Sequence, residues 1–511
     1  MNPNTITEIV IVGGGTAGWM SAAALAHLLD ARRISITVVE SEVIGTVGVG
    51  EATIPPIILF NEMLGINENE FVARTMATFK LGIEFVNWGG LGEAYIHPFG
   101  DFGTDLETLP LHQHWLRAKP AGYGRDLFDF SLMVQAAKRG KFMPAVKNNP
   151  KSVLAGIHYA YQFDAGRYAA FLREYAEARG VKRIEGRVTD VALNGRTGQV
   201  DTLHLEDGRS VPGEFFVDCS GFKGLLIDGA LGAGYEDWRS YLPVDRAIAL
   251  PCESNGPPIP YTRATAHEAG WQWRIPLQHR TGNGHVYCSE FTSDDAALDR
   301  LQSTLDGAAL ADPKQLYFTT GHRREFWKKN VVSLGLAAGF MEPLESTSIH
   351  LVQTGLARLI ALFPDKRFNP VDIETYNTRT LNEYERIRDF LVLHYTATQR
   401  DDTEFWRHCQ SLPQPDSLQQ KIEHFSTSGR IFREANELFT ESSWLAVMYG
   451  QNISPQGWSP LVERFDQAHM IERLEQVANV VSRAADAMPS HTDYINRNCA
   501  GQVPQLSESE A

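Results

Sequence analysis

Cysteine is scarce in this chain: five residues among 511, scattered without a single C-x-x-C pair. An odd and widely spaced set argues against a disulfide framework and against a cysteine-ligated zinc site. It fits reduced thiols in the cytoplasm. The chain also shows no clustered His, Cys and Asp set of the kind that binds a metal, so we expect no metal cofactor.

Basic residues are outnumbered as well, with 47 Lys and Arg against 62 Asp and Glu, for a formal net charge of -15. No long basic run stands out, so we expect no nucleic-acid partner. No stretch approaches the ~18 uninterrupted apolar residues of a membrane-spanning helix. The first residues lack the charged start and long apolar core of a signal peptide, so we expect neither a membrane anchor nor export.

The first forty residues carry the clearest structural signal. An apolar run over 9–12 predicts a buried parallel strand, which is followed by a glycine-rich turn and an alanine-rich helical stretch to about Leu29. A second strand over 36–39 then ends at Glu40. This order of strand, glycine turn, helix, strand and acid is that of a dinucleotide-binding unit.

Each glycine of Gly13-x-Gly15-x-x-Gly18 has a structural role in such a unit. The three allow a tight turn, close approach of the backbone to a pyrophosphate, and close packing of helix on strand. Thr16 and Ala17 lie between them at the expected helix N-terminus, and Glu40 is placed to accept from ribose hydroxyls. The unit alone does not decide between FAD and NAD.

Two later segments favour the longer cofactor. The strand at 214–217 runs into Asp218-Cys219-Ser220-Gly221, and a distant Gly-Leu-Ala-Ala-Gly stands at 335–339. Glycine turns far from the first motif suggest one long cofactor crossing several parts of the fold, and FAD has that length. A further strand is predicted at 188–191.

Helical patterns dominate from Val371 onward. Ile471, Leu474, Val477 and Val481 form one apolar stripe, as expected of an amphipathic helix. We therefore predict an α/β core over 1–370, a mostly helical substrate-binding part over 371–502, and a disordered polar tail over 503–511.

Six motifs together resemble the tryptophan-halogenase family of flavin-dependent halogenases, and the matches extend from residue 9 to about residue 450. They are GGGTAGW (13–19), GVGEATIP (48–55), FKLG (79–82), YIHPFG (95–100), WQWRIP (271–276) and EPLEST (342–347). W-x-W-x-I-P is the most specific, because related flavin monooxygenases share the glycine turn but lack it.

The resemblance implies a Rossmann-like flavin-monooxygenase fold that binds FAD, used as FADH2. It implies O2 and a halide ion, chloride or bromide, as co-substrates, and a separate NADH-dependent flavin reductase as partner. It adds Gly48, Glu51, Val188 and Leu336 to the cofactor-binding residues. The sequence leaves open whether the chain forms a homodimer.

Trp271 and Trp273 lie two positions apart in an extended segment, so both indoles point to one face. On their own such a pair is typical of a core or edge strand. In the family the pair forms a wall that keeps organic substrates away from the flavin, so that a halide ion is oxidised instead.

The resemblance assigns the catalytic roles to Lys80 and Glu345. We expect Lys80 to close a helix that begins near Glu68. Its ammonium can hydrogen-bond hypohalous acid, or its neutral amine can form a haloamine, and the sequence does not choose. Glu345 can orient the halogen donor, stabilise the cationic ring intermediate or take its proton.

Further residues match the family's halide and substrate sites. Thr347 and Ser348 fall where the family binds halide through backbone amides, a natural anion nest, although the family more often has glycine at 348. The residues that match those lining the aromatic substrate are His97, Pro98, Phe99 and Trp444.

The resemblance fails at the amino-acid end of the substrate. Tryptophan-specific members carry a tyrosine pair and a glutamate before the last tryptophan, where this chain has Phe432-Arg433 and Phe439. We therefore expect indole or an indole derivative as substrate rather than free tryptophan. The alternatives are an FAD-dependent aromatic hydroxylase, which would need neither Lys80 nor the tryptophan wall, and a flavin-binding protein without turnover.

Overall fold

A computed structural model describes residues 3–43 and 50–502. They fold into two compact units, each built from three separate chain segments. Unit 1 consists of Met1–Met76, Phe163–Arg239 and Tyr317–Glu385, and unit 2 of Ala77–Gln162, Ser240–Leu316 and Arg386–Ala511. The functional division at residue 370 stays a prediction, and the tail predicted to be disordered lies outside the described residues.

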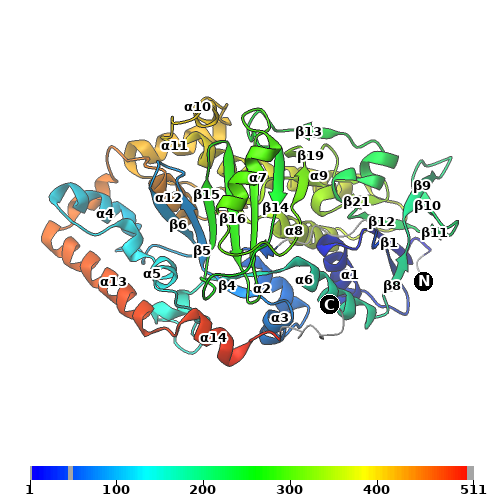
Figure 1. Cartoon of the computed structure of the whole chain (residues 1–511), viewed down its shortest axis with the longest axis horizontal. Coiled ribbons are helices and arrows are strands. Elements are labelled where there is room, and N and C mark those ends of the chain that lie inside the picture. The colour runs from blue at the N-terminus through cyan, green and yellow to red at the C-terminus, as the bar shows by residue number, and fades with distance from the viewer. Residues whose placement is uncertain (1–2, 44–49, 503–511) are drawn as a thin grey trace. The chain divides into compact units, whose positions relative to one another are not determined.

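Unit 1 is built on a six-stranded sheet in the order β20-β21-β12-β1-β2-β8, parallel except at β20 (Figure 1). Its strands are β1 (Glu8–Val12), β2 (Ser35–Glu40), β8 (Lys182–Glu185), β12 (Phe215–Asp218), β20 (Trp327–Lys328) and β21 (Val331–Ser333). The apolar runs of β1 and β12 are buried, and on one face of the sheet Val10 and Phe216 pack against the apolar side chains of Val200, Leu203 and Leu205. The predicted strand, glycine turn, helix, strand order is confirmed.

Helices and short strands complete unit 1. The helices are α1 (Thr16–Leu28), α2 (Pro56–Met63), α3 (Glu68–Arg74), α6 (Ala165–Glu177) and α8 (Ser348–Ala361), and α9 (Pro370–Thr396) begins here and ends in unit 2. The strand predicted at 188–191 is β9 (Val188–Leu193), in a small antiparallel sheet with β10 (Val200–Leu205) and β11 (Ser210–Pro212). A second small sheet contains β13 (Tyr235–Asp237), β19 (Gly321–Arg323) and β22 (Gly339–Phe340). Helix α1 packs against both α6 and α8.

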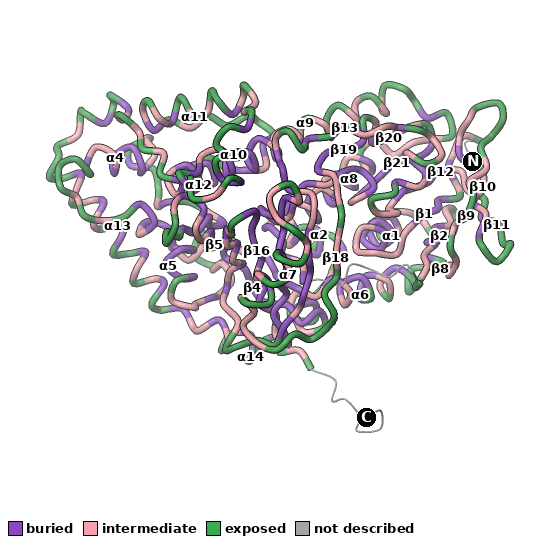
Figure 2. The backbone as a smooth tube through the Cα atoms, turned by 45° about the horizontal axis from the view of Figure 1, so that its top comes forward, coloured by how far each residue is buried: buried purple, intermediate pink, exposed green. Residues whose placement is uncertain are grey.

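Unit 2 contains a seven-stranded sheet in the order β18-β14-β17-β16-β15-β5-β6. Its strands are β5 (Gly82–Val86), β6 (Ala94–Pro98), β14 (Arg246–Ala249), β15 (Thr262–Ala266), β16 (Gly270–Pro276), β17 (Thr281–Tyr287) and β18 (Lys314–Tyr317). The W-x-W-x-I-P segment is β16, extended as predicted and ending at Pro276. It pairs on both sides, with β15 and β17, and is buried along most of its length (Figure 2).

The helices of unit 2 come mostly from the last segment, as predicted. They are α4 (Leu111–Ala118), α5 (Leu132–Lys138), α7 (Asp294–Ser303), α10 (Glu404–Gln410), α11 (Asp416–Ser428), α12 (Glu441–Gly450), α13 (Gln467–Ala487) and α14 (His491–Asn498). Helix α13 runs beside α4 and α5 (Figure 1). Of its predicted apolar stripe, Leu474 and Val481 are buried, whereas Ile471 and Val477 are half-buried.

The helix predicted to end at Lys80 is wrong. Helix α3 begins with Asn67 as its cap and ends at Arg74, and Lys80 is the last residue of strand β4 (Thr78–Lys80). Met76 has a left-handed φ of 54°, which breaks the helix. Strand β4 pairs antiparallel with β7 (Ala160–Asp164), so tertiary pairing overrides the helical periodicity of the sequence.

A residue from the far end of the chain anchors strand β4. The backbone N–H of Phe79 donates to His491 Nε2 at 3.1 Å, and Nδ1 of the same ring donates to the carbonyl of Pro258 at 2.8 Å. The two bonds fix the neutral tautomer, and burial lowers the pKa of His491 to about 4. The strand that carries Lys80 is thereby held on its outer edge by α14.

All five cysteines are free thiols. Within residues 3–43 and 50–502, we find no helix with the length and apolarity to cross a membrane. The same ranges hold no group of three or more His, Cys, Asp or Glu side chains arranged to bind a metal.

Candidate active site

The turn after β1 admits only glycine at two positions. Gly13 has a φ of +111°, and a Cβ there would lie 2.2 Å from the carbonyl oxygen of Cys219. A Cβ on Gly18 would lie 1.8 Å from the carbonyl oxygen of Gly13. Because real Cβ atoms never approach backbone this closely, both glycines are required for α1 to start where it does.

The N-terminus of α1 is open to an anionic ligand. Gly15 is its cap and supplies no side chain, and the first turn carries no acid. The amide groups of Thr16 and Ala17 therefore belong to a helix end whose partial positive charge favours a pyrophosphate. Glu40 ends β2, where it accepts from Trp19 Nε1 at 3.3 Å and pairs with Arg183. These residues fit the diphosphate and ribose of a dinucleotide.

A distant segment meets this helix end, as the sequence suggested. Gly335 has a φ of +62°, and a Cβ on it would lie 2.8 Å from Cβ of Ala17. Leu336 follows in the same short 3-10 turn (Gly335–Ala337). Asp218 has a structural role, because its carboxylate accepts from the backbone N–H groups of Leu226 and Ile227, each at 2.8 Å.

Of the remaining predicted cofactor residues, those that the structure describes also lie in unit 1. Val188 opens β9 and is half-buried, and Glu51 lies in β3 (Gly50–Ala52). Gly48 lies outside the described residues. Their contact with a cofactor stays a prediction.

Burial raises the pKa of Glu51 to about 7 from an ordinary value of 4.5. Between these two values the unfolded chain has released the proton and the native protein still holds it. The free energy of unfolding is therefore expected to fall by about 3 kcal/mol as the pH rises from 4.5 to 7, and then to level off. Thermal or urea unfolding at several pH values should show that Glu51→Gln removes this slope. The exposed Glu62→Gln should keep it, and an unchanged slope in Glu51→Gln would contradict the assignment.

Glu345, Thr347 and Ser348 lie on one short stretch that leads into α8, whose first residue is Ser348. Glu345 closes a 3-10 turn (Pro343–Glu345) and is fully buried, so it is not a surface helix cap. Ser346 takes a left-handed φ of 59°, which turns the chain into α8. Thr347 is the cap of α8 but its hydroxyl does not cap, and that buried Oγ1 has no hydrogen-bond partner among the described residues. An uncapped helix N-terminus with no acid in its first turn suits a halide ion.

Lys80 is fully buried in unit 2. Its Nζ lies 5.2 Å from the ring centroid of Phe99, a distance at which the ammonium is attracted to the ring face. Strands β5 and β6 pair Gly82 with Pro98, which brings the Lys80 strand end and the His97-Pro98-Phe99 segment together. The predicted lysine and the predicted substrate residues 97–99 therefore share one part of unit 2.

Four rings form an aromatic cluster in unit 2: His97, Phe390, Phe439 and Trp444. Phe390 stacks on Phe439 with 3.7 Å between centroids and meets Trp444 edge to face at 4.8 Å. The indole N–H of Trp444 is buried and has no partner among the described residues. Phe390 was missed by sequence reasoning, because an aromatic in the middle of a long helix carries no motif.

An ion pair adjoins this cluster and was also missed. Lys421 of α11 and Glu437, in the loop before α12, are 3.0 Å apart from Nζ to Oε1, with side chains 12% and 2% exposed. The ammonium lies 5.1 Å from the ring centroid of Trp444. The sequence offers only a separation of 16 residues as a signal, which is not a recognised spacing.

The two tryptophans of β16 point to the same face, with 6.3 Å between ring centroids. The ring centroids of Trp271 and Trp88 are also 6.3 Å apart, and Trp273 lies opposite Gly284 in the pairing of β16 with β17. A Cβ on Gly284 would lie 1.9 Å from the Trp273 ring, so the partner strand leaves room for this indole by having no side chain. Glycine inside a strand is a sign of such close approach, but the sequence alone does not name the partner.

We expect Gly284→Ala to displace the Trp273 ring, lowering the free energy of unfolding by about 2 kcal/mol. If the ring is part of a wall that shields the flavin, more oxygen will also be consumed per molecule of product. Thermal unfolding and an oxygen electrode measure the two effects. Gly156→Ala is the matched control in unit 2, because a Cβ there meets nothing within 4 Å. Unchanged stability would mean that the ring is not held where we describe it.

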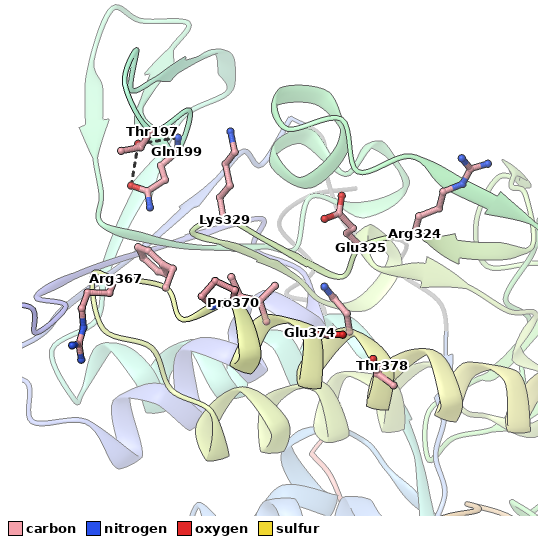
Figure 3. A pocket seen from close by; sticks show the side chains of 12 residues that line it. Thr197, Gln199, Arg324, Glu325, Lys329, Arg367, Pro370, Glu374 and Thr378 are labelled. Carbon is pink, nitrogen blue, oxygen red and sulfur yellow. Dashed lines mark hydrogen bonds between the residues drawn. The ribbon is translucent and has the colours of Figure 1, made fainter.

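A pocket of about 570 Å³ lies in unit 1 at the start of α9 (Figure 3). Its lining mixes cations and acids, namely Arg324, Lys329 and Arg367 with Glu325 and Glu374. None of the predicted site residues lines it, so we assign it no part in the reaction.

Comparison with known proteins agrees with these motifs. The family model described as tryptophan halogenase matches residues 8–467. The tryptophan 6-halogenase of Streptomyces toxytricini is 34% identical over 520 residues, covering 97% of this chain and 98% of its own. A flavin-dependent halogenase from Xanthomonas campestris is similar in structure at 47% identity and a TM-score of 0.94, over 98% of this chain and 100% of its own. One from Brevundimonas sp. is 44% identical with a TM-score of 0.93, over 96% and 99%.

Proposed function

The chain belongs to the tryptophan halogenase family of flavin-dependent halogenases, and we propose that it uses FADH2, O2 and chloride or bromide to halogenate indole or an indole derivative rather than free tryptophan. The observation that carries this proposal is the fully buried Lys80, whose ammonium faces the ring of Phe99 beside the predicted substrate segment. A fixed, buried ammonium beside the predicted substrate segment is what electrophilic halogenation of an aromatic ring requires.

The cofactor-binding residues would be those around the N-terminus of α1. Gly13, Gly15 and Gly18 leave room for a pyrophosphate, and Glu40 would accept from the ribose of the adenosine half. When bound, reduced FAD would supply the two electrons and two protons that, with O2 and one further proton, convert a halide ion into hypohalous acid and water. A separate NADH-dependent reductase would deliver the reduced flavin.

The halide would be held by the start of α8. The amides of Thr347 and Ser348 face no capping side chain, so they can donate to an anion. Serine at 348 supplies the same N–H group as glycine. The buried hydroxyl of Thr347 is a further donor without a protein acceptor among the described residues.

Lys80 and Glu345 would divide the halogenation step. The Lys80 ammonium donates a hydrogen bond to hypohalous acid, which makes the halogen more electrophilic. A ring carbon then forms its bond to halogen as the oxygen–halogen bond breaks, and hydroxide leaves. Glu345 stabilises the cationic ring and takes the ring proton, which finally converts the hydroxide into water. The balance is arene plus hypohalous acid giving haloarene plus water.

The substrate assignment rests on the aromatic cluster. Its rings would stack an electron-rich indole and exclude water. Where tryptophan-specific relatives hold the amino acid, this chain has Phe439, which is buried against Phe390. A phenyl ring there offers no hydrogen-bond acceptor for an ammonium and no donor for a carboxylate, so a substrate without a free amino-acid group is favoured.

The test is a reconstituted reaction with FAD, a flavin reductase, NADH, O2, bromide or chloride, and a panel of indoles that includes tryptophan. Mass spectrometry reads products by their halogen isotope pattern. We expect haloindoles, with indole ahead of tryptophan. Hydroxylated products independent of halide would instead identify an aromatic hydroxylase, and oxygen consumption without any organic product would identify a flavin-binding protein without turnover.

A further inference from the structure

The buried ion pair between Lys421 and Glu437 has no part in the reaction proposed above. Its ammonium also donates to the carbonyl of Phe432 at 2.5 Å, so Lys421 ties the loop before α12 to α11. Arg433 adds a second tie by donating from Nε to the carbonyl of Glu437 at 3.2 Å. The pair therefore fixes the loop that ends in Phe439 and leads to Trp444.

Stability alone does not explain a charged pair in this position. Removing two charges from water costs several kcal/mol per ion, and their attraction offsets this only with excellent geometry. An apolar pair of similar volume would tie the same loop with no such cost. The pair is instead set against an aromatic ring, with Nζ 5.1 Å from the centroid of Trp444.

Two buried carboxylates near the cluster rings are each in an ion pair. Glu437 is held by Lys421, and the other carboxylate next to a cluster ring, Asp389, is 2% exposed and lies 2.9 Å from Arg388. A substrate carrying an ammonium would find each of these carboxylates neutralised. A substrate carrying a carboxylate would find the Lys421 ammonium neutralised. Either would have to break a buried pair and leave one member without a partner, which is strongly unfavourable.

We infer that the Lys421–Glu437 pair is a specificity determinant that excludes indoles with a single charged substituent from the site beside Trp444, and so selects uncharged indoles. This inference rests on the proposed function, because it concerns the substrate of the same site. The inference goes beyond the proposed function in the residues that it names. The lack of the residues that hold the amino-acid end of tryptophan would not by itself exclude a charged substrate. Replacing either Lys421 or Glu437 should therefore allow binding of an indole whose charge is opposite to that of the residue that remains.

The experiment is a competition among equal amounts of indole, tryptamine and indole-3-acetate. Wild type should favour indole. Lys421→Met leaves a free carboxylate and should raise the share of tryptamine about tenfold, whereas Glu437→Gln leaves a free ammonium and should raise indole-3-acetate about tenfold. The double variant removes both charges and should restore the preference for indole. Lys366→Met is the matched control, because it breaks a 2.6 Å pair with Glu214 in unit 1, and it should leave the ranking unchanged.

Binding of the three compounds to the flavin-free protein, measured by calorimetry, separates this inference from the proposed function. If wild type binds indole but halogenates nothing, the proposed function fails and the binding ranking still decides the inference. Single variants with the wild-type ranking would overturn it. Should the single variants not fold, the reversed pair Lys421→Glu with Glu437→Lys keeps both charges. It must then show the wild-type ranking, and a changed ranking would overturn the inference.

Discussion

Replacing Lys80 with methionine should lower halogenation of every substrate by about 10³-fold while flavin binding and oxygen consumption persist. The loss follows from removing the hydrogen-bond donor to hypohalous acid, because a donor fixed where charge develops contributes about 10²–10³-fold in rate. Methionine keeps the volume and the apolar stem of the buried side chain, so strand β4 should remain paired with β7. The expected readout is halogenated product by mass spectrometry, with oxidised halide still detected by a small halogen-accepting dye in solution.

The matched control is Lys182→Met, which alters an exposed lysine in strand β8 and should leave turnover unchanged. Circular dichroism and thermal unfolding establish that the Lys80 variant is folded. Substantial halogenation by a folded Lys80→Met protein would remove the lysine from the mechanism. Loss of oxygen consumption together with product would show that Lys80 acts before the halide is oxidised.

Gly18→Ala should abolish flavin binding, with an affinity loss of at least about 100-fold. The added Cβ would lie 1.8 Å from the carbonyl oxygen of Gly13, so the start of α1 must move away from β1. This shift moves the backbone N–H groups that would bind the pyrophosphate, which removes those hydrogen bonds. The same overpacking should lower the free energy of unfolding by about 3 kcal/mol. Titration against FAD, followed by flavin fluorescence, measures the first effect and urea unfolding the second.

Gly195→Ala is the corresponding control in unit 1, since a Cβ there meets nothing within 4 Å. It should change neither flavin affinity nor stability beyond a few tenths of a kcal/mol. Tight flavin binding by Gly18→Ala would show that the cofactor does not use this helix end.

The elements that the sequence predicted well are those governed by neighbours along the chain. Strand β1, the glycine turn, α1 and β2 follow one another within 40 residues, and the W-x-W-x-I-P strand ends at its own proline. In both stretches the local pattern and the tertiary contacts favour the same structure. This agreement between local pattern and tertiary contacts makes the structure of such segments predictable from the sequence.

The sequence failed where distant residues decide. The strand that contains Lys80 looks like a helix end, and only its pairing with β7 makes it a strand. Phe390, Gly284 and the Lys421–Glu437 pair carry no local motif, because their partners lie on other helices or strands. Periodicity reports which face of an element is apolar, but not which residue lies against it.

The bond from Phe79 to His491 spans 412 residues of sequence. At synthesis rates of 5–20 residues per second, the acceptor leaves the ribosome roughly 20–80 s after the strand it anchors. Each of the two units is likewise complete only when the last of its three chain segments has been made. The strand that carries Lys80 is therefore anchored only when translation is nearly complete, and a chain cut short before α14 lacks this anchor however much of the remainder has formed.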